Sequence, residues 1–165
     1  MGCEHGLGHG LLSYFGYEPA DLKEAVSACD MLEADPWHAC AQGAFMEYNF
    51  RFLTLGEGTG GRPVPEDVYD PCYDYEGEIG QRCVGILPLW WRAILFPDEP
   101  TTAVFSWLGD KCQNLPQELQ HYKAGCFRSI GFVAVTTQDA DASLIEQSCR
   151  AASAGNCRAK FCSQP

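Results

Sequence analysis

The feature that most constrains the fold is the regular spacing of cysteines along the chain. One set recurs at intervals of 43, 40 and 37 residues and comprises Cys29, Cys72, Cys112 and Cys149. A second set recurs at intervals of 43 and 43 residues and comprises Cys40, Cys83 and Cys126. A fixed period near 40 residues with two helices per unit is typical of an α-solenoid. The alternative is an ordinary disulfide-linked helical domain with coincidental spacing.

The two sets predict a disulfide in each unit, joining the end of its first helix to the start of its second. The expected pairs are Cys29–Cys40, Cys72–Cys83 and Cys112–Cys126, and Cys149 should pair with either Cys157 or Cys162. Cys3 fits as the second cysteine of an earlier unit whose first half is missing. Closing a loop of about 12 residues contributes roughly 3 kcal/mol in the chain-entropy model.

Cysteine usage also indicates the compartment. Ten cysteines in 165 residues, an even number, favour disulfides and an oxidising, extracytoplasmic location. Zinc thiolate sites are the competing interpretation, but they need two cysteines about two to four residues apart, and Cys157 and Cys162 come closest to that spacing. Met1 is followed at once by Gly2 and Cys3, without an apolar signal segment. We therefore expect a piece of a longer secreted protein.

Periodicity, proline and glycine predict helices throughout. The expected helices cover residues 3–15, 21–29, 37–52, 80–96 with a bend at Pro88, 101–112, 115–135 with a break near Gly125, and 139–152. Residues 132–137 have strand propensity, but an isolated strand would have nothing to pair with, so they are assigned to a helix. The prediction is one all-α domain over 1–165, built of disulfide-stapled helical hairpins in a short solenoid. Its units are 1–16 (partial), 17–55, 66–97, 100–137 and 139–165.

Composition excludes some partners. The formal net charge of −11 would repel the phosphates of nucleic acids and anionic lipids. No apolar run approaches the roughly 18 residues needed to cross a bilayer. We therefore expect no nucleic-acid partner and no membrane span.

The segment DLKEAVSACDMLEADPWHACAQGAFMEYN, residues 21–49, resembles the disulfide-bonded Sel-one-like repeats, relatives of the tetratricopeptide repeats in secreted cysteine-rich bacterial proteins. The turn between its cysteines is longer than in those repeats, and the loop 55–71 has no counterpart there. The resemblance implies an α-solenoid with a concave surface for protein or peptide, and nothing about catalysis. It makes an extracytoplasmic binding or assembly scaffold the first functional prediction, with Trp37, Tyr48, Trp90 and Trp91 as candidate contacts. For most of the tryptophans, however, we expect a place in the core.

The sharpest chemical feature is the sequence His5-Gly-Leu-Gly-His9. In a helix its two imidazoles lie one turn apart on one face, the spacing that divalent-metal sites use. Aligning the repeats places Glu47 near the pair, as a third ligand or general base. The alternative functional prediction is a metal-dependent enzyme, hydrolytic or of other metal-assisted chemistry, with Zn, Cu or Fe bound by His5, His9 and Glu47. Packed or solvent-facing polar histidines are the competing interpretation.

The remaining candidates are weaker. Cys3 could act as a nucleophile with His5, although a truncated disulfide explains an unpaired Cys3 more simply. His38 and His121 stand at turns before cysteines and resemble ordinary polar residues. The glycine-rich loop 55–65 lacks the lysine of a phosphate-binding loop, and the acidic segment 66–78 lacks the carboxylate pattern of a calcium loop.

Overall fold

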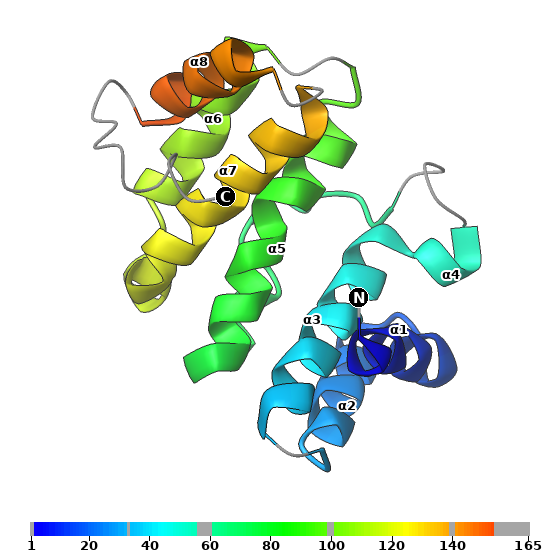
Figure 1. The fold of residues 1–165 in the computed structure, drawn as a ribbon. Coiled ribbons are helices and arrows are strands. Elements are labelled where there is room, and N and C mark those ends of the chain that lie inside the picture. Colours follow the sequence, from blue (N-terminus) through cyan, green and yellow to red (C-terminus); the bar gives the residue numbers. More distant parts are fainter. Residues whose placement is uncertain (1, 33, 56–60, 99–100, 139–140, 154–165) are drawn as a thin grey trace. The chain divides into compact units, whose positions relative to one another are not determined.

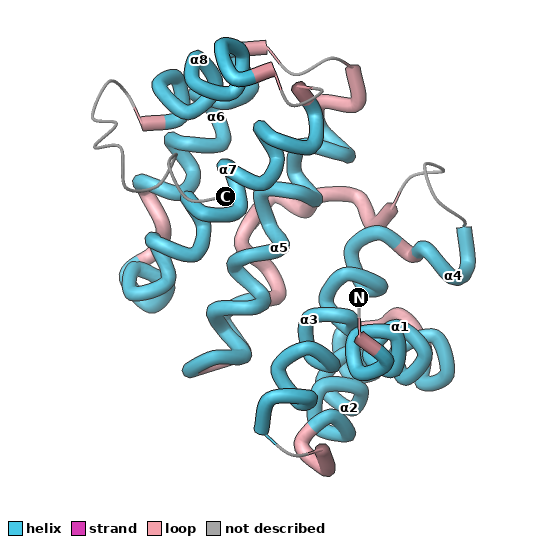
Figure 2. Tube along the Cα trace, in the orientation of Figure 1, coloured by secondary structure: helices cyan, strands magenta, loops and turns pink. Residues whose placement is uncertain are grey.

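The computed structural model describes residues 2–32, 34–55, 61–98, 101–138 and 141–153, with side chains described from residue 38 in the third helix and up to residue 53 in the fourth. Every regular element in these ranges is a helix, and no strand occurs among them (Figures 1 and 2). The all-α prediction is confirmed, including helix over residues 132–137. The chain divides into two compact units, Met1–Ile86 and Leu87–Pro165.

The first unit begins with three helices, α1 (Cys3–Phe15), α2 (Pro19–Cys29) and α3 (Ala34–Phe50) (Figure 1). The ends of α1 and α2 follow from local chemistry. Gly16 ends α1 with φ 132°, a conformation that L side chains rarely adopt. Pro19 suits the first turn of α2, and the Glu18 and Asp21 side chains form a capping box there.

Three further elements follow in this unit: the short helix α4 (Phe52–Leu55), the 3-10 turn η1 (Cys72–Asp74) and the first part of α5 (Gly77–Leu95). Arg51, with φ 55°, separates α4 from α3. Pro88 lies inside α5 without ending the helix, and the bend expected there stays a prediction. The unit boundary at residue 86 falls inside α5 and inside the expected repeat unit 66–97.

Helices α1 and α3 pack with their backbones in contact. A Cβ atom at Gly8 would overlap the carbonyl oxygen of Cys40, and one at Gly43 would overlap the carbonyl oxygen of His5. Glycine is therefore required on both sides of this contact. The contact explains two of the glycines that would otherwise weaken these helices by about 0.5–1 kcal/mol each.

The second unit contains the rest of α5, then α6 (Thr102–Gln113), the 3-10 turn η2 (Gln117–Tyr122), α7 (Lys123–Thr137) and α8 (Ala142–Ala152). The predicted break near Gly125 is wrong in position, because the helix is interrupted before Lys123 and Gly125 lies inside α7. Pro116 precedes η2 and starts this tighter turn. Helix α6 packs on α8 at Gly109, where a Cβ atom would overlap the backbone of Ala152.

All three disulfides predicted between described cysteines are formed. They join α2 to α3, η1 to α5 and α6 to α7, with Cα–Cα distances of 5.7, 5.5 and 5.6 Å for Cys29–Cys40, Cys72–Cys83 and Cys112–Cys126. Cys3 is free and exposed, and Cys149 is free and buried. The expected partners of Cys149, Cys157 and Cys162, lie outside the described residues. In the expected unit 66–97 the 3-10 turn η1 lies where the first helix of a repeat would be. The solenoid arrangement and the single repeat domain stay predictions.

The large aromatic residues fill the cores. Trp90 and Trp91 are completely buried, and Tyr48 is 2% exposed. Their candidate role as surface contacts is wrong, whereas the expectation that most tryptophans lie in the core is confirmed for Trp90 and Trp91. Burying such large side chains stabilises the fold more than exposing them. The fourth candidate, Trp37, has a side chain outside the described set. No helix in the described ranges is long and apolar enough to cross a membrane.

Candidate functional site

A buried polar chain runs between α1 and α3, and its members come from both helices. His5 and His9 lie one turn apart on α1, while Glu47 lies near the end of α3. The close helix contact at Gly8 and Gly43 brings the α1 face that carries the histidines against α3. The sequence prediction that Glu47 lies near the histidine pair is confirmed.

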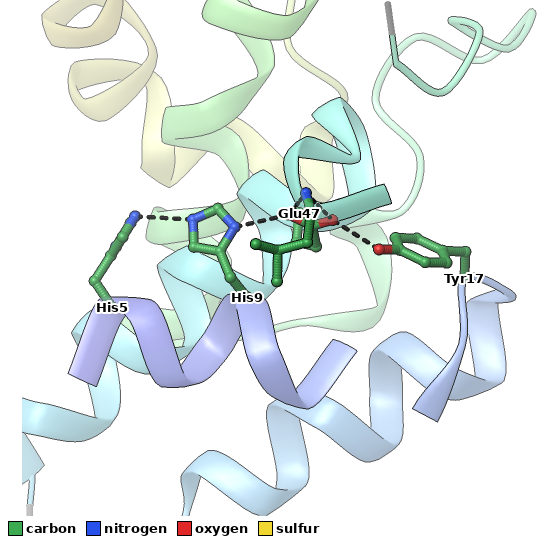
Figure 3. A network of polar contacts seen from close by, with 5 residues as sticks. His5, His9, Tyr17 and Glu47 are labelled. Carbon is green, nitrogen blue, oxygen red and sulfur yellow. Dashed lines mark hydrogen bonds and ion pairs between the residues drawn. The ribbon is translucent and has the colours of Figure 1, made fainter. Parts of the chain in front are cut away.

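The three side chains lie in a row, with His9 in the middle (Figure 3). Nδ1 of His9 is 2.9 Å from Oε2 of Glu47. Its other ring nitrogen, Nε2, is 3.3 Å from Nε2 of His5. The rings of His5 and His9 meet edge to face, with centroids 5.0 Å apart. His9 therefore connects the carboxylate to the second imidazole.

Glu47 is fully buried, and its carboxylate is held by several donors. The Tyr17 hydroxyl donates to Oε1 over 2.7 Å, and the backbone N–H of Leu53 donates to the same oxygen over 3.0 Å. Leu53 lies in the first turn of α4, where backbone N–H groups have no partner within the helix. A buried carboxylate is tolerated when such donors replace water.

This environment fixes the proton positions on His9. An ionised carboxylate can only accept hydrogen bonds, so Nδ1 of His9 carries the hydrogen that points to Glu47. In the neutral ring, Nε2 of His9 is then a lone-pair acceptor. The carboxylate thus orients His9 and sets its tautomer, as second partners of histidines commonly do.

Burial is the largest influence on His5. The pKa of His5 is lowered by desolvation and, to a smaller extent, by the charge of a protonated His9. Hydrogen bonding to the backbone of Ala39 acts in the opposite direction. Burial prevails, so the neutral imidazole of His5 is favoured inside the protein.

The three-ligand metal arrangement is not formed in this geometry. A shared metal would need one donor atom from each residue to converge on a point, but Glu47 and His5 lie at opposite nitrogens of His9. Among the described residues, no group of three or more His, Cys, Asp or Glu side chains could hold a metal ion. Both oxygens of Glu47 already face donors inside the protein, and its role as a general base stays a prediction.

The weaker sequence candidates do not join this chain. Residues two apart on a helix point to different sides, and accordingly Cys3 is exposed while His5 is buried. The geometry therefore gives no support to a Cys3–His5 nucleophile pair. His121 is exposed, with its ring 3.7 Å from that of Tyr122. His38 is half-buried on α3.

Sequence reasoning missed a second polar cluster, centred on Arg62. Its guanidinium contacts the Asp70 carboxylate at 3.0 Å and the Asn49 side chain at 3.3 Å, and it lies over the ring of Tyr48. Its backbone N–H donates to the Asn49 carbonyl over 2.8 Å. Arg62 lies in the segment predicted as a glycine-rich loop, and these contacts anchor it to α3. Tyr17 and Leu53 were also missed, because no pattern links them to Glu47.

Comparisons of the chain with protein-family models, with characterised proteins and with solved structures find no match. Functional inference for this protein therefore depends on its own geometry.

Proposed function

We propose that the protein is an extracytoplasmic scaffold of disulfide-bonded helical repeats that binds a protein or peptide, of the kind the Sel-one-like resemblance implies. The observation that supports this proposal most is the set of three disulfides, each closing a chain reversal between successive elements. Such bonds persist in oxidising compartments. The packing of alternate helices, α1 on α3 and α6 on α8, is also what stacked hairpins produce.

Binding by this scaffold would use exposed side chains rather than the buried tryptophans. In the first unit Leu7 and Tyr14 are exposed on α1, seven residues apart and so on one face of the helix. In the second unit Phe132 and Val135 are exposed on α7. Single exposed apolar residues are common on any protein, so these positions are attachment points for a test rather than a mapped interface.

The scaffold proposal is tested by site-specific crosslinking in the extracytoplasmic compartment. A photo-reactive residue replaces Tyr14 in one variant and Phe132 in another, and exposed Ser143 on α8 is the matched control. We expect a discrete crosslinked partner from at least one of the first two variants, which disappears when the protein is reduced and alkylated. If none of the variants crosslinks and the purified chain turns over a substrate, the scaffold proposal fails.

A second candidate function is metal-assisted chemistry at the histidine pair. The observation that favours it is the buried Glu47–His9–His5 chain, because a buried carboxylate that orients an imidazole is costly to maintain without a use. Zinc-loaded protein would be assayed on activated ester and phosphate-ester substrates, with His9→Gln as the comparison. If the parent protein turns over a substrate and the variant does not, the result supports the enzyme proposal. Equal rates in both proteins would exclude it.

A further inference from the structure

The distance between the two facing imidazole nitrogens fits a shared metal ion. Nε2 of His5 and Nε2 of His9 are 3.3 Å apart. Imidazole nitrogens bind zinc at about 2.0–2.1 Å, and two ligands at that distance from a tetrahedral ion are about 3.3 Å apart. The pair is therefore spaced as one edge of a metal's coordination shell.

The partner of His9 leaves its facing nitrogen without a hydrogen. Nδ1 of His9 donates to Glu47, so Nε2 of the neutral ring presents a lone pair toward His5. Either a proton on Nε2 of His5 or a cation can therefore lie between the two nitrogens. A carboxylate on the far ring nitrogen is also a usual outer partner of a metal-binding histidine.

Both rings are held firmly and keep a small exposed area. His5 is 8% exposed, and the His9 side chain is 13% exposed. Both are carried by one helix that is pressed against α3, so little side-chain freedom would be lost when an ion binds. Imidazole nitrogens suit borderline divalent cations such as Zn²⁺, Cu²⁺ and Ni²⁺ rather than Ca²⁺ or Mg²⁺.

We propose that His5 and His9 bind one borderline divalent transition-metal ion through their Nε2 atoms, with Glu47 as an outer partner that positions His9. The sequence prediction made Glu47 a third ligand or a general base, whereas the geometry places it behind His9. The ion would have two protein ligands and water at its other positions. This proposal shares with the second candidate function only the premise that a metal is bound. A bound ion without turnover would leave it standing and would remove the enzyme.

The direct test is a zinc titration of the disulfide-intact, chelator-treated protein carrying ¹⁵N-labelled histidine. Long-range ¹H–¹⁵N spectra report each ring nitrogen separately. We expect the Nε2 signals of His5 and His9 to shift together and to saturate at one equivalent of zinc. His38 and His121 are internal controls whose signals should not move with that transition. Because the parent protein is used, this result does not depend on a variant that folds.

Variants then separate the direct ligands from the outer partner. His5→Gln and His9→Gln should each lower zinc affinity by at least tenfold in calorimetry, whereas the matched control His121→Gln should change nothing. Glu47→Gln should lower affinity by about 10- to 100-fold while the remaining zinc still shifts both Nε2 signals. Disulfide mapping of each variant verifies that its three hairpin bonds are intact.

Two results would overturn the proposal. If zinc leaves both Nε2 signals unmoved at several equivalents, the rings share only a proton. If X-ray absorption of the loaded protein shows a carboxylate oxygen in the first shell, and Glu47→Gln removes it, Glu47 is a ligand and the outer-partner assignment is wrong.

Discussion

Two pairs of helices in this protein pack closely through glycine, but they differ in the side chains that they bury. In the first unit α1 meets α3 at Gly8 and Gly43, and in the second α6 meets α8 at Gly109. In each case the missing side chain lets one helix touch the backbone of the other. Each pair also lies beside a hairpin closed by a disulfide, Cys29–Cys40 or Cys112–Cys126.

The two pairs differ in what they enclose. The α1–α3 pair surrounds buried His5 and Glu47, whereas the described part of the second unit buries no histidine, aspartate or glutamate. The buried polar side chain on α8 is a hydroxyl, that of Ser148. Close helix packing therefore does not require the ionisable chain. Because that chain carries a desolvation cost, the comparison supports it as the site of the second candidate function.

The largest expected effect is from the disulfides, which should stabilise both units alike. Replacing Cys29 and Cys40 together by alanine should lower the free energy of unfolding by about 2–4 kcal/mol, and replacing Cys112 and Cys126 together should do the same. The two loops are similar in length, with sequence separations of 11 and 14. Denaturant unfolding measures both. A loss confined to one unit would show that the bonds are not equivalent staples.

The glycine contacts should come next. Gly8→Ala and Gly109→Ala should each cost about 1–3 kcal/mol in denaturant unfolding, since the added methyl group forces two backbones apart. Gly6→Ala is the matched control on α1, because a Cβ atom there meets nothing within 4 Å. That variant should gain about 0.5–1 kcal/mol. Equal destabilisation by Gly6→Ala and Gly8→Ala would contradict the packing.

The charge of Glu47 can be removed without leaving a cavity. Glu47→Gln keeps the shape but loses the charge that Tyr17, His9 and Leu53 face, and it should cost about 1–2 kcal/mol. Ser148→Ala in the second unit should cost less than about 1 kcal/mol. Thermal and denaturant unfolding measure this difference. If Glu47→Gln is more stable than the parent and leaves His9 unchanged, the chain is not a coupled unit.

The smallest expected effect concerns a buried polar group of the first unit that lies outside the Glu47–His9–His5 chain. The Tyr75 hydroxyl is buried and has no hydrogen-bond partner in the described part of the chain. Burial raises the pKa of Tyr75, and Asp74 adds to the shift. Because the folded-state pKa lies above the unfolded value of about 10, stability is full below that pH and is lost above it.

The variant Tyr75→Phe should therefore change stability by less than about 0.5 kcal/mol at neutral pH and should weaken the alkaline loss. Urea unfolding at neutral and alkaline pH tests this. An unchanged alkaline loss in the variant would assign it to another group.

The sequence predicted much of this architecture because cysteine spacing and helical periodicity act locally. Periodicity placed the second helix at 21–29, two residues short of its start at Pro19, and the repeat period predicted the pairs Cys29–Cys40, Cys72–Cys83 and Cys112–Cys126. Helix spacing also placed His5 beside His9. The period of the repeat predicted that Glu47 would lie near them.

What the sequence could not predict depends on side-chain direction and on distant contacts. Whether Glu47 would converge with His5 on a metal or stand behind His9 depends on which ring nitrogen it faces. The donors come from Tyr17, between α1 and α2, and from Leu53, in the short helix α4, and no periodicity predicts the position of either. The anchoring of the loop by Arg62 at Asn49 and Asp70 is of the same kind.

The central claim is that the α1–α3 contact builds a directed chain from Glu47 through His9 to His5. Long-range ¹H–¹⁵N spectra of the metal-free, ¹⁵N-histidine protein test it most directly, at a pH where the imidazoles are neutral. The claim predicts that His9 carries its hydrogen on Nδ1, facing Glu47, while exposed His121 shows the Nε2–H form usual in water. A His9 ring with its hydrogen on Nε2 and a bare Nδ1 would contradict the claim, because a carboxylate cannot donate to it.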